Sequence, residues 1–223
     1  MVRTHPRWLR TRELIRAGRI GELRLITGSF GFFNRDGKNV RNIYEFGGGA
    51  LLDVGCYPVT LSRFIFGEEP SRVMALIDRD PDMKTDRLTS AMLESPSGQS
   101  TFTCSTQLAY NQRITLIGTK GRIDIERPLN TPNDQPTRIL IDDNPSAHTG
   151  TGVTAETIAP CDQFTIQGDL FSKAIRDGGD VPVPLEDSLS NMAVIDALFR
   201  SAQSGKWEWP QAESPEEVKP PVG

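Results

Sequence analysis

Histidine and cysteine are scarce in this sequence of 223 residues, and their scarcity excludes several kinds of site. The two histidines are His5, beside a proline, and His148, and neither completes a Ser-His-Asp pattern or a histidine-rich metal centre. The cysteines, Cys56, Cys104 and Cys161, are odd in number, widely spaced and without a CxxC pair. Neither a disulfide framework nor a zinc site is therefore indicated. We predict no metal site and a reducing compartment.

Long apolar runs and a secretory leader are also missing. No run approaches the ~20 apolar residues that a membrane-spanning helix needs. The first residues contain no apolar segment of the kind found in signal peptides. Lysine and arginine number 25 against 29 aspartates and glutamates, and the net charge of −4 argues against a protein that coats nucleic acid. We expect a soluble, cytoplasmic protein whose partners include neither nucleic acid nor a membrane.

Positive charge is concentrated at the start of the chain. Residues 1–41 carry ten basic and three acidic side chains, although the whole chain is negative. We interpret this segment mainly as a solvated helix face with loop arginines. The alternative is a surface that faces phosphates or an acidic neighbouring domain.

Helical and extended patterns occupy different parts of the chain. Apolar spacing and end signals predict helices at 6–17, 50–66, 162–177 and 187–204. Strands are predicted at 22–32, 71–78, 87–94, 99–108, 113–118, 122–126 and 137–142. Turns at 96–98 and 119–121 make neighbouring strands mostly antiparallel, and 131–136 and 143–159 are predicted as polar loops. Pro58 should distort the second helix.

These elements predict an α+β fold with a large, mainly antiparallel, open-faced sheet and helices on one face. Residues 1–209 form the predicted domain, and 210–223 form an acidic, proline-rich tail that we expect to be disordered. The uncovered sheet face needs a partner, so we expect a homo-oligomer, most simply a homodimer, through that face.

The segment from Gly47 to Pro58, GGGALLDVGCYP, is the most informative one. A spacing of four places Asp53 and Tyr57 on one helix face, where a carboxylate and a phenol can together move a proton. A phenol with a pKa near ~10 needs a nearby cation to act as a base at neutral pH, and no lysine lies close in the sequence. Glycines such as Gly48 and Gly49 would let a polar ligand or another backbone approach. From the residues alone, a capped helix with a surface aspartate and a packed tyrosine is the favoured interpretation.

The glycine triplet of this segment does not form a nucleotide loop. It matches neither G-x-G-x-x-G nor G-x-x-x-x-G-K-[ST], and no strand directly precedes it in a βαβ context. A phosphate-binding loop is therefore excluded at this position.

The same segment resembles the signature helix of the glucose–fructose oxidoreductase / inositol dehydrogenase (Gfo/Idh/MocA) family. RTHP at 3–6 with LIRAGRIG at 14–21, GTKGRIDI at 118–125 and VPLEDS at 183–188 are similar to other segments of that family. The resemblance spans about residues 2–209 and corresponds to the substrate-binding and dimerisation domain. The family's N-terminal Rossmann domain, with its dinucleotide loop and Glu-Lys-Pro motif, has no counterpart in these 223 residues.

The resemblance implies roles for particular residues. Tyr57 stands at the position of the family's catalytic Tyr or His, and Asp53 at the substrate-orienting carboxylate. Arg3 and His5 match the segment that passes the substrate and cofactor cleft, and we place Gly48 and Gly49 in the same cleft. By the resemblance, the substrate is a sugar, polyol or diol, and its identity should be set by loops 34–46 and 143–161. NAD or NADP is expected for an intact family member, and we expect this chain alone to bind neither.

Two functions of different classes remain open from the sequence. The first is the substrate-binding half of an NAD(P)-dependent oxidoreductase that transfers hydride to or from a sugar, polyol or diol. The second is a non-catalytic, standalone binding or dimerisation module derived from that family. A weaker third possibility is that another chain supplies the Rossmann domain.

Overall fold

The protein is described by a computed structural model that covers residues 1–143 and 152–210. Its sheet consists of the strands β1 (Leu23–Phe33), β2 (Arg72–Arg79), β3 (Asp86–Ser95), β4 (Gly98–Ser105), β5 (Gln107–Gly118), β6 (Arg122–Glu126), β7 (Thr137–Asp142) and β8 (Thr154–Ile158). The strand order is β2-β3-β4-β1-β5-β6-β7-β8. β1 pairs with β4 in parallel, and every other pairing is antiparallel. The predicted mainly antiparallel sheet is confirmed.

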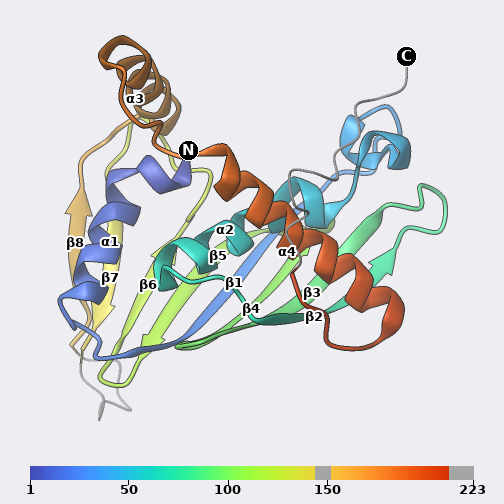
Figure 1. The fold of residues 1–223 in the computed structure, drawn as a ribbon, viewed down its shortest axis with the longest axis horizontal. Coiled ribbons are helices and arrows are strands. Elements are labelled where there is room, and N and C mark those ends of the chain that lie inside the picture. The colour runs from blue at the N-terminus through green and yellow to red at the C-terminus, as the bar shows by residue number, and fades with distance from the viewer. Residues whose placement is uncertain (144–151, 211–223) are drawn as a thin grey trace.

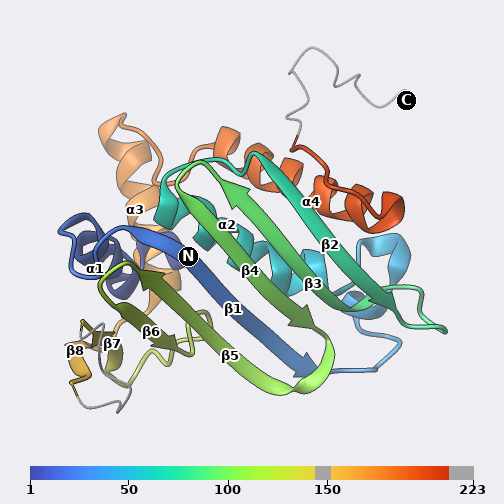
Figure 2. The same ribbon diagram turned by 90° about the horizontal axis from the view of Figure 1, so that it is seen from below.

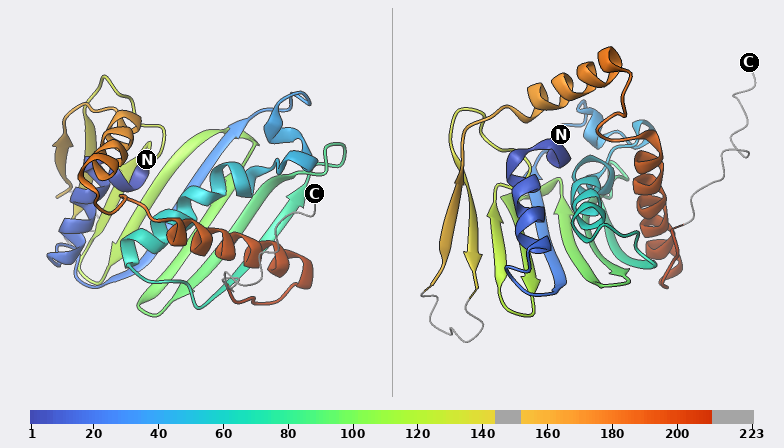
Figure 3. Two further views of the ribbon diagram at one scale, coloured as in Figure 1. Left: turned by 45° about the horizontal axis from the view of Figure 1, so that its top comes forward. Right: turned by 60° about the vertical axis from the view of Figure 1, so that its left-hand side comes forward.

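Helices cover only one face of this sheet. They are α1 (Pro6–Arg16), α2 (Cys56–Phe66), α3 (Gln163–Asp177) and α4 (Leu185–Ser204). α1, α2 and α4 lie over the same face, and α3 lies near the N-terminal residues (Figures 1 and 3). Figure 2 looks onto the opposite face, which no described helix covers. The predicted α+β class with an open-faced sheet is therefore confirmed.

The core lies between the helices and the covered face of the sheet. Alternation along the strands brings Ile26 of β1 into register with Ser100 of β4 and Leu116 of β5, and all three are buried. Trp8 of α1 is fully buried, and its indole N–H donates to the carbonyl of Pro128 at 3.0 Å. This bond ties α1 to the segment that follows β6.

The second predicted helix is irregular at its start, as Pro58 led us to expect. A π-helical turn, Leu51–Gly55, precedes α2. Pro58 has no amide hydrogen and cannot complete the α-helical bond to the residue four positions before it, so a wider turn is accommodated here.

Two predicted boundaries were wrong. The strand expected at 99–108 crosses a chain reversal, since β4 ends at Ser105 and β5 begins at Gln107. The Ser105 hydroxyl donates to the Arg87 carbonyl at 2.6 Å and accepts the Gln107 N–H at 2.9 Å, which holds the reversal. β8 falls inside the predicted loop 143–159, because it is an edge strand of mainly exposed residues with little apolar alternation. The predicted tail from residue 211 onward lies outside the described residues.

Candidate active site

The two residues predicted to be catalytic, Asp53 and Tyr57, line one cavity of about 260 Å³. The remaining lining residues come from β1, the loop after it, the π-helical turn before α2, β5 and the loop after β6: Phe30, Phe32, Asn34, Arg41, Val54, Tyr110 and Asn130. This volume lies near the lower end of small-molecule pockets and suits a small ligand better than a dinucleotide.

Gly48 and Gly49 allow the start of the helical segment that carries Asp53 and Tyr57 to pack closely against other parts of the same polypeptide. A Cβ on Gly48 would come within 2.7 Å of the Arg41 carbonyl, and one on Gly49 would overlap the carboxylate of Asp86. The Gly49 N–H donates to the Arg41 carbonyl at 2.9 Å, and Asp86 accepts the Leu51 N–H at 2.6 Å. Gly48 and Gly49 do not line the cavity, although the sequence placed them in a substrate or cofactor cleft. They instead allow the backbone that carries Arg41 to pack against the helix start.

Arg41 is the cation beside Asp53 that the sequence did not identify. Its Nε lies 3.0 Å from both carboxylate oxygens of Asp53. Burial raises the pKa of the Asp53 carboxyl, and the charge of Arg41 and its hydrogen bond act in the opposite direction. Arg41 lies in loop 34–46, which was predicted to set substrate identity. The sequence therefore indicated the right loop but did not identify this side chain.

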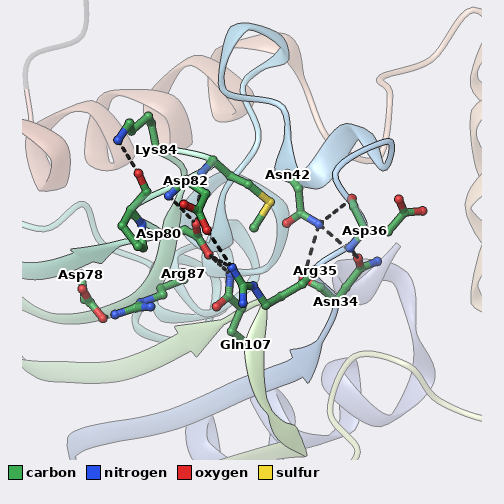
Figure 4. A network of polar contacts seen from close by, with 12 residues as sticks. Asn34, Arg35, Asp36, Asn42, Asp78, Asp80, Asp82, Lys84, Arg87 and Gln107 are labelled. Carbon is green, nitrogen blue, oxygen red and sulfur yellow. Dashed lines mark hydrogen bonds and ion pairs between the residues drawn. The ribbon is translucent and has the colours of Figure 1, made fainter.

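The loop that carries Arg41 is anchored by a polar network, shown in Figure 4. Asn42 Nδ2 donates to Asn34 Oδ1 at 3.1 Å and to the Asp36 carbonyl at 3.0 Å. Arg35 lies 3.4 Å from the buried carboxylate of Asp80, which also accepts from Gln107 Nε2 at 2.7 Å. The network fixes the position of Asn34 and restricts the loop that leads to Arg41.

Tyr57 presents a free hydroxyl to the cavity. No residue in the described parts of the chain is hydrogen bonded to it, and its ring packs beside Phe30 at a centroid distance of 6.2 Å. Burial raises the pKa of the phenol, as do the charges of Cys56 and Asp53, whereas Arg41 lowers it. The phenol therefore stays protonated at neutral pH and can donate a proton to a ligand oxygen in the cavity.

Comparison with known proteins shows which family this domain belongs to. The model of the GFO/IDH/MocA C-terminal domain matches residues 8–124, which is more than half of the chain. The chain belongs to the Gfo/Idh/MocA family. It is the C-terminal domain of that family, as the resemblance predicted.

Individual members of the Gfo/Idh/MocA family resemble the chain over most of its length. It is 42% identical to the uncharacterized oxidoreductase ORF334 of Rhizobium meliloti, over 93% of this chain and 62% of that protein. It is 30% identical to D-xylose 1-dehydrogenase (NADP(+)) 2 of Haloferax volcanii, over 92% of this chain and 61% of that protein. The crystal structure of aldose-aldose oxidoreductase from Caulobacter crescentus complexed with glycerol superposes with a TM-score of 0.79 at 25% identity, covering 93% of this chain and 62% of that one. The chain thus spans less than two thirds of the length of these Gfo/Idh/MocA proteins.

Arg3 and His5, the other predicted cleft residues, do not line the cavity of Tyr57. Arg3 forms an ion pair with Asp187 of α4, and its guanidinium lies 5.1 Å from the centre of the Phe64 ring. His5 is 1% exposed and precedes α1, where its Nδ1 accepts the Arg7 N–H at 3.0 Å. Both residues have structural contacts that account for their positions within this domain of the Gfo/Idh/MocA family.

The prediction that loop 143–161 helps to set substrate identity gains no support from the residues that line the cavity. The described part of 143–161 contributes no residue to the cavity, and residues 144–151 lie outside the description. Asn130 and Tyr110 line the cavity instead. They come from the β5–β7 half of the sheet, and no local pattern in the sequence links them to Tyr57.

Acidification should destabilise the domain through His5. Burial, and secondarily the charge of Arg7, lowers the pKa of His5 to about 4. The unfolded chain, with an ordinary value of 6.5, then binds more protons than the folded one between pH 6.5 and 4, so stability falls as the pH is lowered through this window. Protonation of Nδ1 would also remove the acceptor for the Arg7 N–H.

We expect the free energy of unfolding to fall by up to about 1.4 kcal/mol per pH unit in this window through His5 alone. Asparagine keeps an acceptor at the start of the helix and does not titrate. Urea unfolding of the unmodified protein and of His5→Asn at pH 7 and pH 4.5 should therefore show a smaller acid loss in the variant. Equal losses in the two proteins would contradict the assignment.

The described residues contain neither a cluster of metal-ligating side chains nor a helix able to cross a membrane. Within residues 1–143 and 152–210, no group of three or more His, Cys, Asp or Glu side chains could hold a metal ion. None of the described helices has the length and apolar character required to cross a membrane. All three cysteines are free thiols.

Proposed function

We propose that this domain is the substrate-binding half of an NAD(P)-dependent oxidoreductase that transfers hydride to or from a sugar, polyol or diol. The observation that carries the proposal is the placement of Tyr57, Asp53 and Arg41 around one small cavity. The names of the relatives support the substrate class, since one is a D-xylose dehydrogenase and another an aldose-aldose oxidoreductase.

Within this proposal, each residue of the cavity has a distinct task. The hydroxyl of Tyr57 would donate its proton to the substrate oxygen during reduction, and in the reverse step its phenolate would accept the proton of the substrate hydroxyl. Asp53, held by Arg41, would accept hydrogen bonds from substrate hydroxyls and so fix the orientation of the sugar. Asn34 and Asn130 can each donate and accept further hydrogen bonds, which suits a polyhydroxylated ligand.

The cofactor enters the proposal only as the carrier of hydride. A nicotinamide would accept or supply the hydride when bound, and the unpaired Tyr57 hydroxyl fits the complementary proton step. The glycine triplet before the Tyr57 helix does not match a dinucleotide loop. We therefore propose that a dinucleotide-binding domain outside these 223 residues holds NAD or NADP.

A fusion protein tests this function directly. The domain would be joined to the part of the Rhizobium meliloti oxidoreductase that its alignment does not cover, and NAD⁺ and NADP⁺ reduction would be followed with aldoses, polyols and diols. We expect turnover with at least one of these substrates. A folded fusion that binds cofactor and turns over none of them would favour the non-catalytic binding module.

We further propose a homodimer through the open sheet face. That face carries an apolar hollow of about 420 Å³ lined by residues that include Leu76 and Met92, whose exposed fractions are 78% and 44%. Thr101 and Thr103 adjoin them, and none of the residues that line the hollow is charged, which suits a self-complementary contact. The free thiols agree with the predicted cytoplasmic location, which we retain in the proposal.

Charge on this face should disrupt the homodimer. Leu76→Glu would bury a carboxylate on each side of a symmetric contact, so we expect a monomer by size-exclusion chromatography with light scattering. Leu9→Glu is the matched control, because Leu9 is an exposed leucine of α1 on the helix-covered side. A dimer that survives Leu76→Glu, or a monomeric unmodified protein at high concentration, would refute this interface.

A further inference from the structure

Helix α3 presents an apolar stripe to solvent. Phe164, Phe171 and Ile175 are 60%, 50% and 67% exposed. Residues four, seven and eleven positions apart share one face of a helix, so these side chains form a continuous stripe that also includes Gly168. The polar residue Lys173 lies on the opposite side of the helix by the same spacing. An exposed apolar face of this kind marks a surface where another structure binds.

Few contacts hold α3 to the rest of the domain. Of its 15 residues only Gln163 and Ala174 are buried, and none belongs to the hydrophobic core. Gln163 Nε2 donates to the Leu129 carbonyl at 2.9 Å, and Asp162 accepts the Phe164 N–H at 2.9 Å. Both bonds are at the start of the helix. Isolated helices of about 12–15 residues or fewer are marginal in water, so burial of the stripe by another structure would stabilise α3.

Gly168 lies in the middle of the stripe, where the domain itself gives it no packing role. A Cβ at this position would meet nothing within 4 Å, so no described residue requires a glycine here. Glycine is unfavourable inside a helix relative to alanine. It does, however, let a neighbouring backbone or side chain come close to the helix. Gly168 therefore favours a closely packed neighbour over the stripe.

The first residues of the chain lie beside α3. Val2–Thr4 form a short 3-10 helix that contacts both α3 and α2, and Figures 1 and 3 show the N-terminus next to α3. Val2 and Thr4 are buried, and the Thr4 hydroxyl donates to the Met1 carbonyl at 2.9 Å. The position of Met1 relative to α3 is therefore fixed. A domain joined to Met1 would begin next to both α3 and α2, and the start of α2 carries Tyr57.

The relatives indicate what such a domain would be. The matched family model is a C-terminal domain, and the chain spans 62% of the Rhizobium meliloti oxidoreductase. A C-terminal domain follows the rest of its protein, so the remaining part would join at residue 1. Hydride transfer also requires the nicotinamide to reach a substrate in the cavity of Tyr57, which places its domain close to α2.

We propose, building on the proposed function, that the apolar stripe of α3 is the docking surface for the dinucleotide-binding domain. Phe164, Phe171 and Ile175 would be buried against that domain, and Gly168 would allow its close approach. The contact would hold the cofactor domain beside α2 and so keep the nicotinamide near Tyr57. The open sheet face remains available for a second copy of the chain, because the two surfaces belong to different elements.

Hydrogen–deuterium exchange of the 223-residue protein and of the fusion protein tests the docking surface. Mass spectrometry would follow peptides of α3 and, as a reference, peptides of β3. We expect the amides of α3 to exchange at least about tenfold more slowly in the fusion protein, because a covered helix opens less often. The amides of β3 should exchange alike in the two proteins, since the sheet is complete in both.

Two variants separate docking from a general effect of the fusion. Ile175→Glu places a carboxylate in the stripe, and it should return the exchange of α3 in the fusion protein to the rate of the 223-residue protein. In the 223-residue protein the same change should leave the urea midpoint unchanged, because Ile175 is largely exposed there. Lys173→Glu, the matched control, introduces the same side chain on the opposite side of α3, and the slow exchange should persist.

Two results would overturn the docking surface. One is a fusion protein with protected amides in both of its parts in which α3 exchanges as fast as in the 223-residue protein. The other needs no fusion protein and is slow exchange of α3 in the 223-residue protein itself. Dependence of that slow exchange on protein concentration would assign the stripe to a second copy, and independence would assign it to another segment of the same chain.

Turnover of the fusion protein reports separately on the proposed function. Slow exchange of α3 in an inactive fusion protein would support the docking surface and contradict hydride transfer. Fast exchange of α3 in an active fusion protein would contradict the docking surface and leave hydride transfer supported. The two proposals can therefore fail independently.

Discussion

Replacing Tyr57 with phenylalanine in the active fusion protein should lower turnover by about 10²- to 10⁴-fold, the range typical of a lost general acid or base. The reason is that the Tyr57 hydroxyl has no partner among the described residues, its pKa is raised, and Tyr57 lines the cavity with Asp53 and Arg41. KM should change far less than kcat, since phenylalanine keeps the ring that packs on Phe30. Steady-state kinetics with the best substrate of the panel measure both quantities.

The matched control for this variant is Tyr44→Phe. Tyr44 is an exposed tyrosine of the preceding turn, Tyr44–Phe46, and it does not line the cavity. Its loss should leave turnover unchanged. In the reductive direction, activity should persist across neutral pH and decline only above pH 10, because the pKa of Tyr57 is raised from its ordinary value of 10.0. Unchanged turnover in Tyr57→Phe would remove this residue from the proposed mechanism.

Replacing Gly49 with alanine should destabilise the domain by about 3–5 kcal/mol. Gly49 has a φ of +128°, a conformation that alanine rarely adopts, and the added Cβ would overlap the carboxylate of Asp86. Relief of that overlap would move Asp86 away from the Leu51 N–H and break a buried bond of 2.6 Å. Urea unfolding with linear extrapolation measures the loss.

Gly37→Ala is the control for this effect. Gly37 has no positive φ, and a Cβ there would meet nothing within 4 Å, so the change should lie within about 0.5 kcal/mol of the unmodified protein. A Gly49→Ala variant as stable as Gly37→Ala would show that the triplet is not held against Asp86. Gly49 would then regain the cleft role that the sequence suggested.

The pairing of Asp53 with Tyr57 could be predicted from the sequence because it is local. A spacing of four places two side chains on one helix face whether or not the rest of the fold is known. The π-helical turn before α2 does not separate them, and both line the same cavity. The sheet was likewise predictable, since turns after β3 and β5 specify antiparallel neighbours.

Arg41, Asn130 and the roles of the glycines could not be predicted in the same way. Arg41 reaches Asp53 from twelve residues earlier, through a loop whose path depends on Asn42 and on the buried Asp80. Asn130 comes from the segment between β6 and β7, which is distant from Tyr57 in the sequence. Gly49 looked like room for a ligand because nothing in the sequence shows that Asp86 fills that space. Long-range packing decides all three positions, and local patterns do not encode it.

The most direct test of the central claim is a crystal structure of the fusion protein with NADP⁺ and its best sugar or polyol substrate. The account predicts that the reacting hydroxyl lies within about 2.6–3.2 Å of Tyr57 Oη, and that Asp53 accepts a hydrogen bond from a neighbouring hydroxyl. A substrate bound outside the cavity of Tyr57, Asp53 and Arg41 would contradict the account.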